Sequence, residues 1–472
     1  MSRRHVLVFA YHFPPIGGGG VPRTLAFVKH LGDFGWNVTV VTGPAVAGSD
    51  LGSAQADVMV DETLLGQIPE SVEIVRVAGP EPGRASRRRE RAERWLGLRL
   101  ARPWSKWWIE AATDMASRVK SVDVAYASMS PYESAWVGRD VGASLGIPWV
   151  ADLRDPWALD EMQVFPTAMH RALERRRMRA LLRTAARVVM NTPEAAREFS
   201  DAFPELDGRL TSITNGYEPA DFESPAPEID PALFRIVFTG GAWNLHIGRR
   251  HRRQRIVRRA LGAGIKDVDL LPRSTMFLLE ATERLLSRRP ELRGFITVEI
   301  AGSGSPEDTL EFESLGGVSH GYLTHTESVR LIRSADMLFL GMQDLGDAQR
   351  ANSVPGKTYE YIASGRPIIA AVPPGDARDL LSTVSNAIVC RPTDVAAMER
   401  AIERLVDRKR EGRAEPTRSD VPSGYDRVSL TRALASVLDS ALDSALDGAS
   451  SHARPEGVSA AASTAPAVRQ RS

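Results

Sequence analysis

Apolar runs and helical patterns alternate along most of the chain. Continuous apolar runs suit strands that are covered on both faces, as in a parallel sheet. Between the runs, segments such as 22–34, 133–145 and 275–287 carry apolar residues at the spacing of a helix with one buried face. The predicted strands are 6–11, 37–42, 122–128, 148–153, 187–190, 210–214, 234–238, 296–300, 337–340 and 368–372. This alternation predicts an α/β protein with parallel sheets.

A proline-rich stretch divides the chain. With 472 residues, two or three domains are expected. Residues 223–233 contain three prolines and are typical of a linker, so the predicted domains are 1–222 and 234–430. Residues 431–446 form a helix with leucine at every fourth position, which we expect to pack onto the second domain or a partner. The Ala-, Ser- and Pro-rich tail 447–472 is expected to be disordered.

Composition excludes several classes of protein. The formal net charge is +1, so no bulk attraction to nucleic acid is expected. The single cysteine, Cys390, excludes an intrachain disulfide and suits a reducing cytoplasm. No apolar run reaches the length of about 18 residues that would span a bilayer. The first apolar run is interrupted at 11–15, which indicates a strand and not a signal peptide. The chain is expected to be cytoplasmic, with peripheral contact to the inner membrane face as an option.

Two basic segments stand out. Residues 84–108 hold nine Arg and Lys against two Glu, interleaved with four tryptophans. Such a segment suits either a solvated helix with tryptophans docked on the core or a contact with a membrane surface. Residues 245–273 also hold nine Arg and Lys, here against two Asp, and are expected to form a flexible surface loop.

The stretch 352–376, NSVPGKTYEYIASGRPIIAAVPPGD, carries the clearest chemistry. A Pro-Gly turn precedes a short helix, a glycine stop and an apolar strand. The turn therefore lies at a helix N-terminus, where free N–H groups and the helix dipole attract anions. Lys357 adds a positive charge, and Glu360 lies one turn further on the same side. A phosphate beside a carboxylate that can bind ribose hydroxyls suggests a nucleotide-sugar site, although a plain turn with a solvated ion pair has the same pattern.

This stretch resembles the nucleotide-binding signature of retaining GT-B glycosyltransferases of the family 4-like type, in the subgroup that has PGKxxEY followed by SGRPI. The resemblance implies two Rossmann-like α/β domains facing a central donor cleft. It also implies that Glu360 binds the ribose and that Lys357 binds the donor phosphates. In the family, a second glutamate stands eight positions before Glu360, and this chain has Asn352 there.

Other motifs follow in the family's order. The opening YHFPPIGGGGVPR resembles the loop that faces the donor phosphates and the acceptor, so Gly17, Gly18 and Gly19 are expected to bind phosphate. The segment DLRDPW at 152–157 resembles a subgroup signature. It places Arg154 where many members have a histidine and Asp155 at the acidic residue that follows. Together with Asn352, these two residues are the expected catalytic set.

The second domain has matching loops. Thr239-Gly240-Gly241 resembles a diphosphate-binding loop, so Gly241 is expected at the phosphates. The arginine that accompanies it is Arg249, Arg250 or Arg273, which the sequence does not distinguish, and we take Arg250. Tyr322 and Leu323 match the loop that contacts the base.

These observations predict a hexosyltransferase-type enzyme. It would move a sugar from a UDP- or GDP-sugar to a glycan or lipid-linked acceptor, with retention, in bacterial cell-surface polysaccharide or glycoconjugate biosynthesis. No cofactor and no essential metal are expected, because the only Asp-x-Asp sequence lies in the basic insertion. A nucleotide-sugar epimerase of the same fold and a non-catalytic nucleotide-sugar-binding subunit are the alternatives.

Overall fold

The fold is described from a computed structural model of the chain. The structure describes residues 3–44, 60–77, 103–240, 245–262, 264, 266–302, 304–346, 349–413 and 421–452. For a few residues at the start of α3, within α8 and at the end of α15, only the backbone is described.

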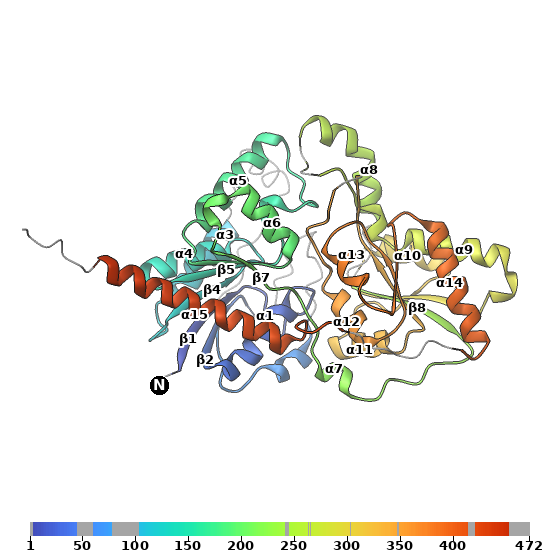
Figure 1. Ribbon diagram of the computed structural model, residues 1–472, viewed down its shortest axis with the longest axis horizontal. Helices are drawn as coiled ribbons and strands as arrows, with labels where there is room; N and C mark the ends of the chain where they lie inside the picture. The colour runs from blue at the N-terminus through green and yellow to red at the C-terminus, as the bar shows by residue number, and fades with distance from the viewer. Residues whose placement is uncertain are drawn as a thin grey trace, which may run out of the picture.

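A parallel sheet forms the centre of the N-terminal domain (Figure 1). Its order is β3-β2-β1-β4-β5-β6-β7. The strands are β1 Arg4–Ala10, β2 Trp36–Thr42, β3 Glu73–Arg76, β4 Val124–Ser128, β5 Trp149–Leu153, β6 Arg187–Met190 and β7 Leu210–Ser212. β1, β4 and β5 are almost wholly buried, which explains their continuous apolar sequences.

Helices cover both faces of this sheet. One face packs against α3 Pro103–Ala116, α4 Ser134–Leu145, α5 Ala168–Leu182 and α6 Pro193–Ala202. The other face packs against α1 Val21–His30 and α15 Arg427–His452. A short helix, α7 Ala220–Glu223, then leads toward the second domain.

The C-terminal domain repeats the plan around a second parallel sheet with the order β11-β10-β8-β12-β14-β15. Its strands are β8 Phe234–Thr239, β10 Ile296–Ala301, β11 Val318–Ser319, β12 Met337–Gly341, β14 Ile368–Ala371 and β15 Ala387–Cys390. One face packs against α9 Met276–Arg288, α10 Pro306–Ser314 and α14 Val395–Arg410. The other packs against α11 His325–Arg333, α12 Lys357–Ser364 and α13 Asp376–Leu381. β9 Val268–Asp269 and β13 Asp344–Leu345 form a small antiparallel pair.

Local signals in the sequence are confirmed at several element ends. Gly35 and Gly365 end their helices in the left-handed conformation, with φ of 84° and 67°. Thr192 caps α6 by accepting a hydrogen bond from the backbone N–H of Ala195. Cys390 is buried at the end of β15, as expected for a structural thiol.

The basic insertion was wrongly predicted to be a flexible loop. Residues 245–260 form the helix α8 Leu245–Ala260, and 271–273 form one turn of 3-10 helix. Ion pairs fix α8 to its surroundings: Arg249 binds Glu311, and Arg252 binds Asp269. Arginine has a high helix propensity, and these carboxylates neutralise part of the helix's charge.

The C-terminal helix was also wrongly predicted to pack onto the second domain. α15 returns to the N-terminal sheet, where Leu434 and Leu438 are buried among residues of β1, β4 and α1. The helix continues to His452, so 447–452 is helical and not part of a disordered tail. Residues 453–472 lie outside the described residues.

The tryptophan-rich segment is described only in part. Residues 84–102 lie outside the described residues. Trp104 and Trp108 of α3 dock on the core: the indole N–H of Trp104 donates to the Tyr11 hydroxyl (3.1 Å) and that of Trp108 to the Ser134 hydroxyl (3.3 Å). Trp107 packs against the same cluster. These tryptophans therefore serve packing. None of the described helices is both long and apolar enough to cross a membrane.

Candidate active site

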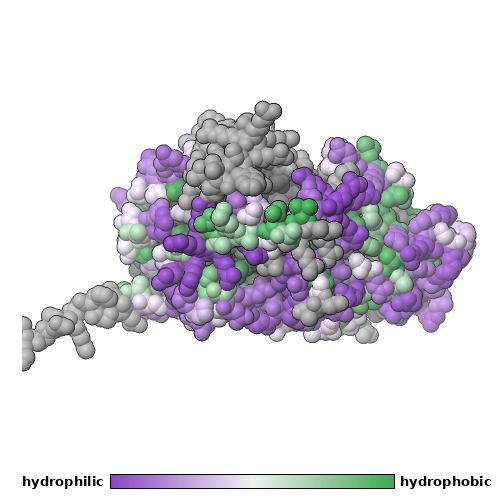
Figure 2. Space-filling view, turned by 90° about the horizontal axis from the view of Figure 1, so that it is seen from above, coloured by the Kyte–Doolittle hydropathy of each residue, from purple (hydrophilic) through white to green (hydrophobic). Residues whose placement is uncertain are grey.

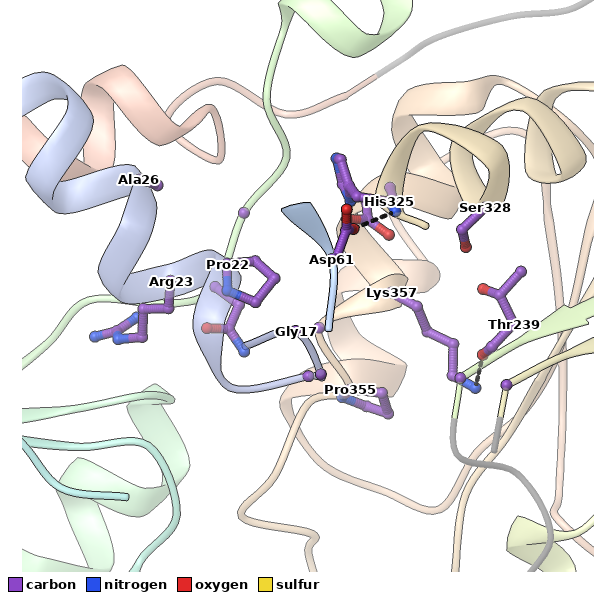
Figure 3. A pocket seen from close by; sticks show the side chains of 18 of the residues that line it. Gly17, Pro22, Arg23, Ala26, Asp61, Thr239, His325, Ser328, Pro355 and Lys357 are labelled. Carbon is purple, nitrogen blue, oxygen red and sulfur yellow. Dashed lines mark hydrogen bonds between the residues drawn. The ribbon is translucent and has the colours of Figure 1, made fainter. Parts of the chain in front are cut away.

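A cavity of about 500 Å³ lies between the two domains (Figure 3). From the N-terminal domain it is lined by the loop after β1, the first turns of α1 and the segment after β7. From the C-terminal domain it is lined by the ends of β8 and β10 and the N-terminal parts of α11 and α12. The lining residues include Gly17, Gly18, Gly19, Arg23, Asp61, Asn215, Thr239, Gly240, Arg273, Tyr322, Leu323, His325, Pro355, Lys357, Glu360 and Arg427. The cavity thus collects the carboxyl ends of strands from both sheets, where ligands of open α/β sheets bind.

The glycine-rich loop presents its backbone to the cavity. Gly18 has φ of 98°, a left-handed conformation that favours glycine. At Gly20, a Cβ atom would lie 2.0 Å from the guanidinium of Arg154, so any side chain there would force Arg154 to move. The loop runs directly into the N-terminus of α1, where Pro22 occupies the first turn. Free N–H groups at this helix start are suited to an anion.

The N-terminus of α12, in the C-terminal domain, faces the glycine-rich loop of the N-terminal domain and carries Lys357. The Lys357 ammonium donates to the backbone carbonyl of Thr239 (2.5 Å) and lies 3.3 Å from the centroid of the Phe238 ring. Burial and the positive charge of Arg273 hold the pKa of Lys357 well below its usual value, although Glu360 acts in the opposite direction. This end of the cavity therefore holds buried positive charge that an anion would stabilise.

A carboxylate lies one helical turn away from Lys357. Glu360 lies 3.8 Å from the guanidinium of Arg427, which comes from the start of α15. His325 begins α11: its ring bonds Asp221 (2.7 Å) and its backbone N–H donates to Asp61 (3.0 Å). Burial lowers the pKa of His325, but the Asp221 hydrogen bond and the Glu360 charge outweigh burial, so its pKa is raised.

The DLRDPW segment lies beside the cavity but does not line it. Asp152, fully buried, binds Arg23 through two hydrogen bonds of 2.9 and 2.8 Å and accepts a third from the Tyr126 hydroxyl (2.6 Å). It therefore fixes the position of Arg23 at the cavity wall. Arg154 lies against Gly20, and Asp155 is exposed. Burial and Arg154 lower the pKa of His12 to about 4, so His12 is neutral at pH 7.

Asn352 lies in the contact between the domains, outside the residues that line the cavity. Its side-chain NH₂ donates to the Leu159 carbonyl (3.0 Å) and to Glu198 (2.6 Å). Its backbone N–H donates to the buried Glu161 (3.1 Å). Lys266 also binds Glu161 and Glu198, at 3.1 and 2.6 Å. A glutamate at 352 could donate to neither partner and would face two carboxylates, so the asparagine fits this surrounding.

Two family models match the chain over most of its length. The Glycosyl transferase 4-like domain matches residues 18–216, and the Glycosyl transferases group 1 domain matches residues 272–408. The two matches include most of the residues that line the cavity, from both domains, in the order that the motifs predict. The chain is a GT-B glycosyltransferase of the family 4-like type.

Solved structures show the same two-domain fold. A glycosyltransferase from Rickettsia africae covers 95% of this chain and 98% of its own, with a TM-score of 0.51 and 12% identity. A trehalose 6-phosphate synthase from Burkholderia multivorans covers 96% and 99%, with a TM-score of 0.53 and 12% identity. An E. coli structure described as bound with UDP-2-fluoro glucose covers 95% and 98%, with a TM-score of 0.52 and 11% identity. No curated protein sequence matches the chain.

The glycosyltransferase cavity gathers part of the predicted site. It is lined by Gly17, Gly18, Gly19, Lys357, Glu360, Tyr322 and Leu323, whereas Arg154, Asp155, Asn352 and Arg250 are not among the described residues at its wall. Gly241 lies outside the described residues. Of the three candidate arginines, Arg249 binds Glu311, Arg250 is exposed on α8, and Arg273 lines the cavity.

Sequence reasoning missed His325 and Arg427. Neither belongs to a motif, because α11 and α15 reach the cavity through tertiary packing. Arg23 could have been found, since it is the last residue of the first-loop motif. Its pairing with Asp152 could not, because Asp152 stands 129 positions away in the sequence.

Proposed function

We propose that this glycosyltransferase moves a sugar from a nucleoside diphosphate sugar to an acceptor hydroxyl, with retention of the anomeric configuration. The observation that carries the proposal is the charge layout of the cavity. Lys357, Arg273 and the N-termini of α1 and α12 converge at one place, and Glu360 stands one helical turn away. This layout suits a diphosphate with a ribose attached. Two similar structures are described as bound with UDP-2-fluoro glucose and with UDP, which supports a nucleotide-sugar donor.

The diphosphate would be held by groups of both domains. Backbone N–H groups of the 17–19 loop and of the α12 start would donate to its oxygens, and Lys357 and Arg273 would supply positive charge. A bound anion would favour the charged form of Lys357, which burial and Arg273 disfavour, so the pKa of Lys357 would rise toward the usual value. Because these groups are aimed at the leaving diphosphate, they stabilise the charge that grows as the glycosidic bond breaks.

Glu360 is proposed to accept hydrogen bonds from the ribose hydroxyls, with Tyr322 and Leu323 against the base. Arg427 lies close enough to orient the carboxylate of Glu360. In the reaction, the bond between the anomeric carbon and the β-phosphate oxygen breaks, and a bond to the acceptor oxygen forms on the same face. The acceptor proton passes to the leaving phosphate, which balances the charge.

We further propose that the reaction proceeds without an essential metal, since Lys357 and Arg273 stand where cationic charge is needed. The acceptor is proposed to be a glycan or lipid-linked hydroxyl of a cell-surface polysaccharide or glycoconjugate. Transfer that continues after treatment with a chelator would support the metal-free route, and a complete loss that added Mg²⁺ restores would contradict it.

The donor site is tested by thermal unfolding with UDP, GDP, ADP and their sugar conjugates. A ligand at 100 times its Kd stabilises the folded state by about 2.7 kcal/mol. We expect one nucleotide family to raise the Tm of the wild type and to do so far less in Glu360→Ala. Glu313→Ala, an exposed glutamate on α10, is the matched control and should respond as the wild type does.

The same sample is then used to detect sugar transfer and its stereochemistry. Incubation with the matching sugar conjugate and simple acceptors, followed by NMR of the anomeric signal, distinguishes retention from inversion. If no nucleotide shifts the Tm of the wild type, the donor-site proposal fails. If nucleotides bind and a transferred sugar has inverted configuration, the donor site stands and the proposed stereochemistry is wrong.

A further inference from the structure

The ends of α5 and α8 meet at one edge of the molecule, although they belong to different domains (Figure 1). The backbone N–H of Ala168, at the start of α5, donates to the carbonyl of Leu261, just after α8 (2.9 Å). Arg171 of α5 donates to the carbonyl of Gly264 (2.5 Å). The two helices thus present a common outer surface, which we call the α5–α8 face.

Large apolar side chains are exposed on this face. Met169 and Leu173 of α5 are 65% and 42% exposed, and Val257 and Leu261 at the end of α8 are 60% and 49% exposed. Figure 2 looks down onto this edge and shows green side chains gathered along its middle, with purple side chains bordering them. Four exposed apolar side chains at the meeting point of two helices are more than scattered surface residues, and such clusters mark interaction sites.

The surroundings of these apolar residues are basic. Arg176, Arg250 and Arg253 are exposed and make no ion pair within the described part of the chain. Arg179 and Arg252 are paired, with Glu205 and Asp269. The sequences of α5 and α8 contain a single carboxylate, Glu174. It is buried, where it accepts a hydrogen bond from the Trp157 indole (2.9 Å), so it does not offset the exposed arginines.

We propose that the α5–α8 face docks on a membrane surface that contains anionic lipids. Exposed arginines would contact the phosphate headgroups, and Met169, Leu173, Val257 and Leu261 would enter the boundary between headgroups and acyl chains. A surface that combines exposed arginines with bulky apolar side chains supplies both parts of such a contact, attraction to anionic lipids and burial of apolar area. The apolar residues favour a membrane over nucleic acid, whose backbone offers them no apolar surface.

This proposal does not depend on the proposed donor or reaction. It places the membrane contact on a different surface from α3, whose described tryptophans pack against the core. Because the face is built from both domains, it exists as one surface only while the domains are held together as they are here. The transferase would then sit on the membrane with its interdomain contact closed.

Co-sedimentation with vesicles tests the proposal. The full chain, without donor, is mixed with vesicles of phosphatidylcholine alone and of phosphatidylcholine with phosphatidylglycerol. We expect binding to the anionic vesicles that weakens as salt is raised. Each basic residue near an anionic surface contributes about 1 kcal/mol. Arg176→Glu with Arg253→Glu, one change on each helix, should therefore weaken partitioning by about 30-fold or more.

A second variant tests the apolar part of the α5–α8 face. Met169→Ser with Val257→Ser should weaken partitioning by about tenfold or more, since burying a side chain of this size contributes roughly 1.5–3 kcal/mol. The matched controls are Arg400→Glu with Arg404→Glu on α14, and Leu310→Ser with Leu315→Ser at α10. The two leucines are 67% and 58% exposed, close to the values for Met169 and Val257. Both controls should partition as the wild type does.

Thermal unfolding confirms that each variant is folded before its partitioning is compared. No binding to anionic vesicles overturns the proposal. Equal losses in the α14 control and the Arg176/Arg253 variant also overturn it, because net charge and not this face would then be responsible. Binding of single-stranded poly(U) RNA that the Arg176/Arg253 variant loses, without vesicle binding, would assign the face to nucleic acid instead.

Discussion

Replacing Lys357 by methionine should change ligand binding and fold stability by very different amounts. Methionine keeps most of the length and the apolar stem but removes the charge. In the folded protein the ammonium has one carbonyl partner, Thr239, and lies over the Phe238 ring. Burial and Arg273 hold its pKa well below the usual value, so the charged form is disfavoured where it stands. Losing the hydrogen bond costs about 1 kcal/mol, and removing a poorly solvated charge offsets a similar amount.

We therefore expect the free energy of unfolding of Lys357→Met to stay within about 1 kcal/mol of the wild type. Donor binding should respond far more. A hydrogen bond to a charged group contributes about 1.5–3 kcal/mol, which corresponds to a 10- to 150-fold weaker Kd for the nucleotide. Nucleoside should bind both proteins equally, because it lacks the phosphates that Lys357 would contact.

Urea unfolding without ligand and calorimetric titration with nucleotide measure the two quantities. The lowered pKa adds a pH signature: nucleotide binding should weaken as pH rises through the pKa of Lys357, and the slope should flatten in the methionine variant. Wild-type affinity in Lys357→Met would refute phosphate binding by this residue. A loss of more than 2 kcal/mol in unfolding free energy without ligand would show that Lys357 is primarily structural.

Three further predictions follow from buried groups. Burial, with Asp155 as a further cause, raises the pKa of Asp160 to about 7, so the folded state loses stability as pH rises from about 4 to 7. Asp160→Asn should remove that loss and stabilise the protein at pH 8 by up to about 4 kcal/mol. Urea unfolding at pH 5 and pH 8 measures the stabilisation, and an equal stabilisation at both pH values would contradict the prediction. Leu438→Ala should cost about 2–5 kcal/mol, because Leu438 is fully buried, whereas Leu446→Ala, at a 60% exposed position of the same helix, should cost under about 0.5 kcal/mol; equal costs would refute the packing of α15. Asn352→Glu should destabilise the contact between the domains by about 3 kcal/mol or more, since it places a carboxylate beside Glu161 and Glu198. Comparing the free energies of unfolding of the variant and the wild type measures this loss, and equal stabilities would contradict the contacts of Asn352.

The sequence predicts best where the physical cause is local. Buried strands appear as continuous apolar runs, and Gly365 stops α12 because only the left-handed conformation continues the chain there. For the same reason the placement of Lys357 and Glu360 on one side of α12 follows from helical spacing alone. Both residues line the cavity as that spacing requires.

Prediction fails where distant segments decide the outcome. The insertion 245–273 has the composition of a solvated loop, yet Arg249 and Arg252 find carboxylates on α10 and β9, which allow a helix. Asn352 lies eight positions before Glu360, but its neighbours Glu198 and Glu161 come from the other domain. No pattern around residue 352 carries that information.

The course of α15 links these long-range contacts to the cavity. Its leucines bury themselves against the N-terminal sheet, so its first turn is held at the boundary between the domains. From there Arg427 donates its backbone N–H to the Tyr217 carbonyl (3.0 Å) and faces Glu360 of the other domain. The packing of a helix on one domain therefore positions a charge beside a carboxylate on the other. A change in how the two domains meet would alter the distance between Arg427 and Glu360, and with it the orientation of the carboxylate that we propose binds the ribose.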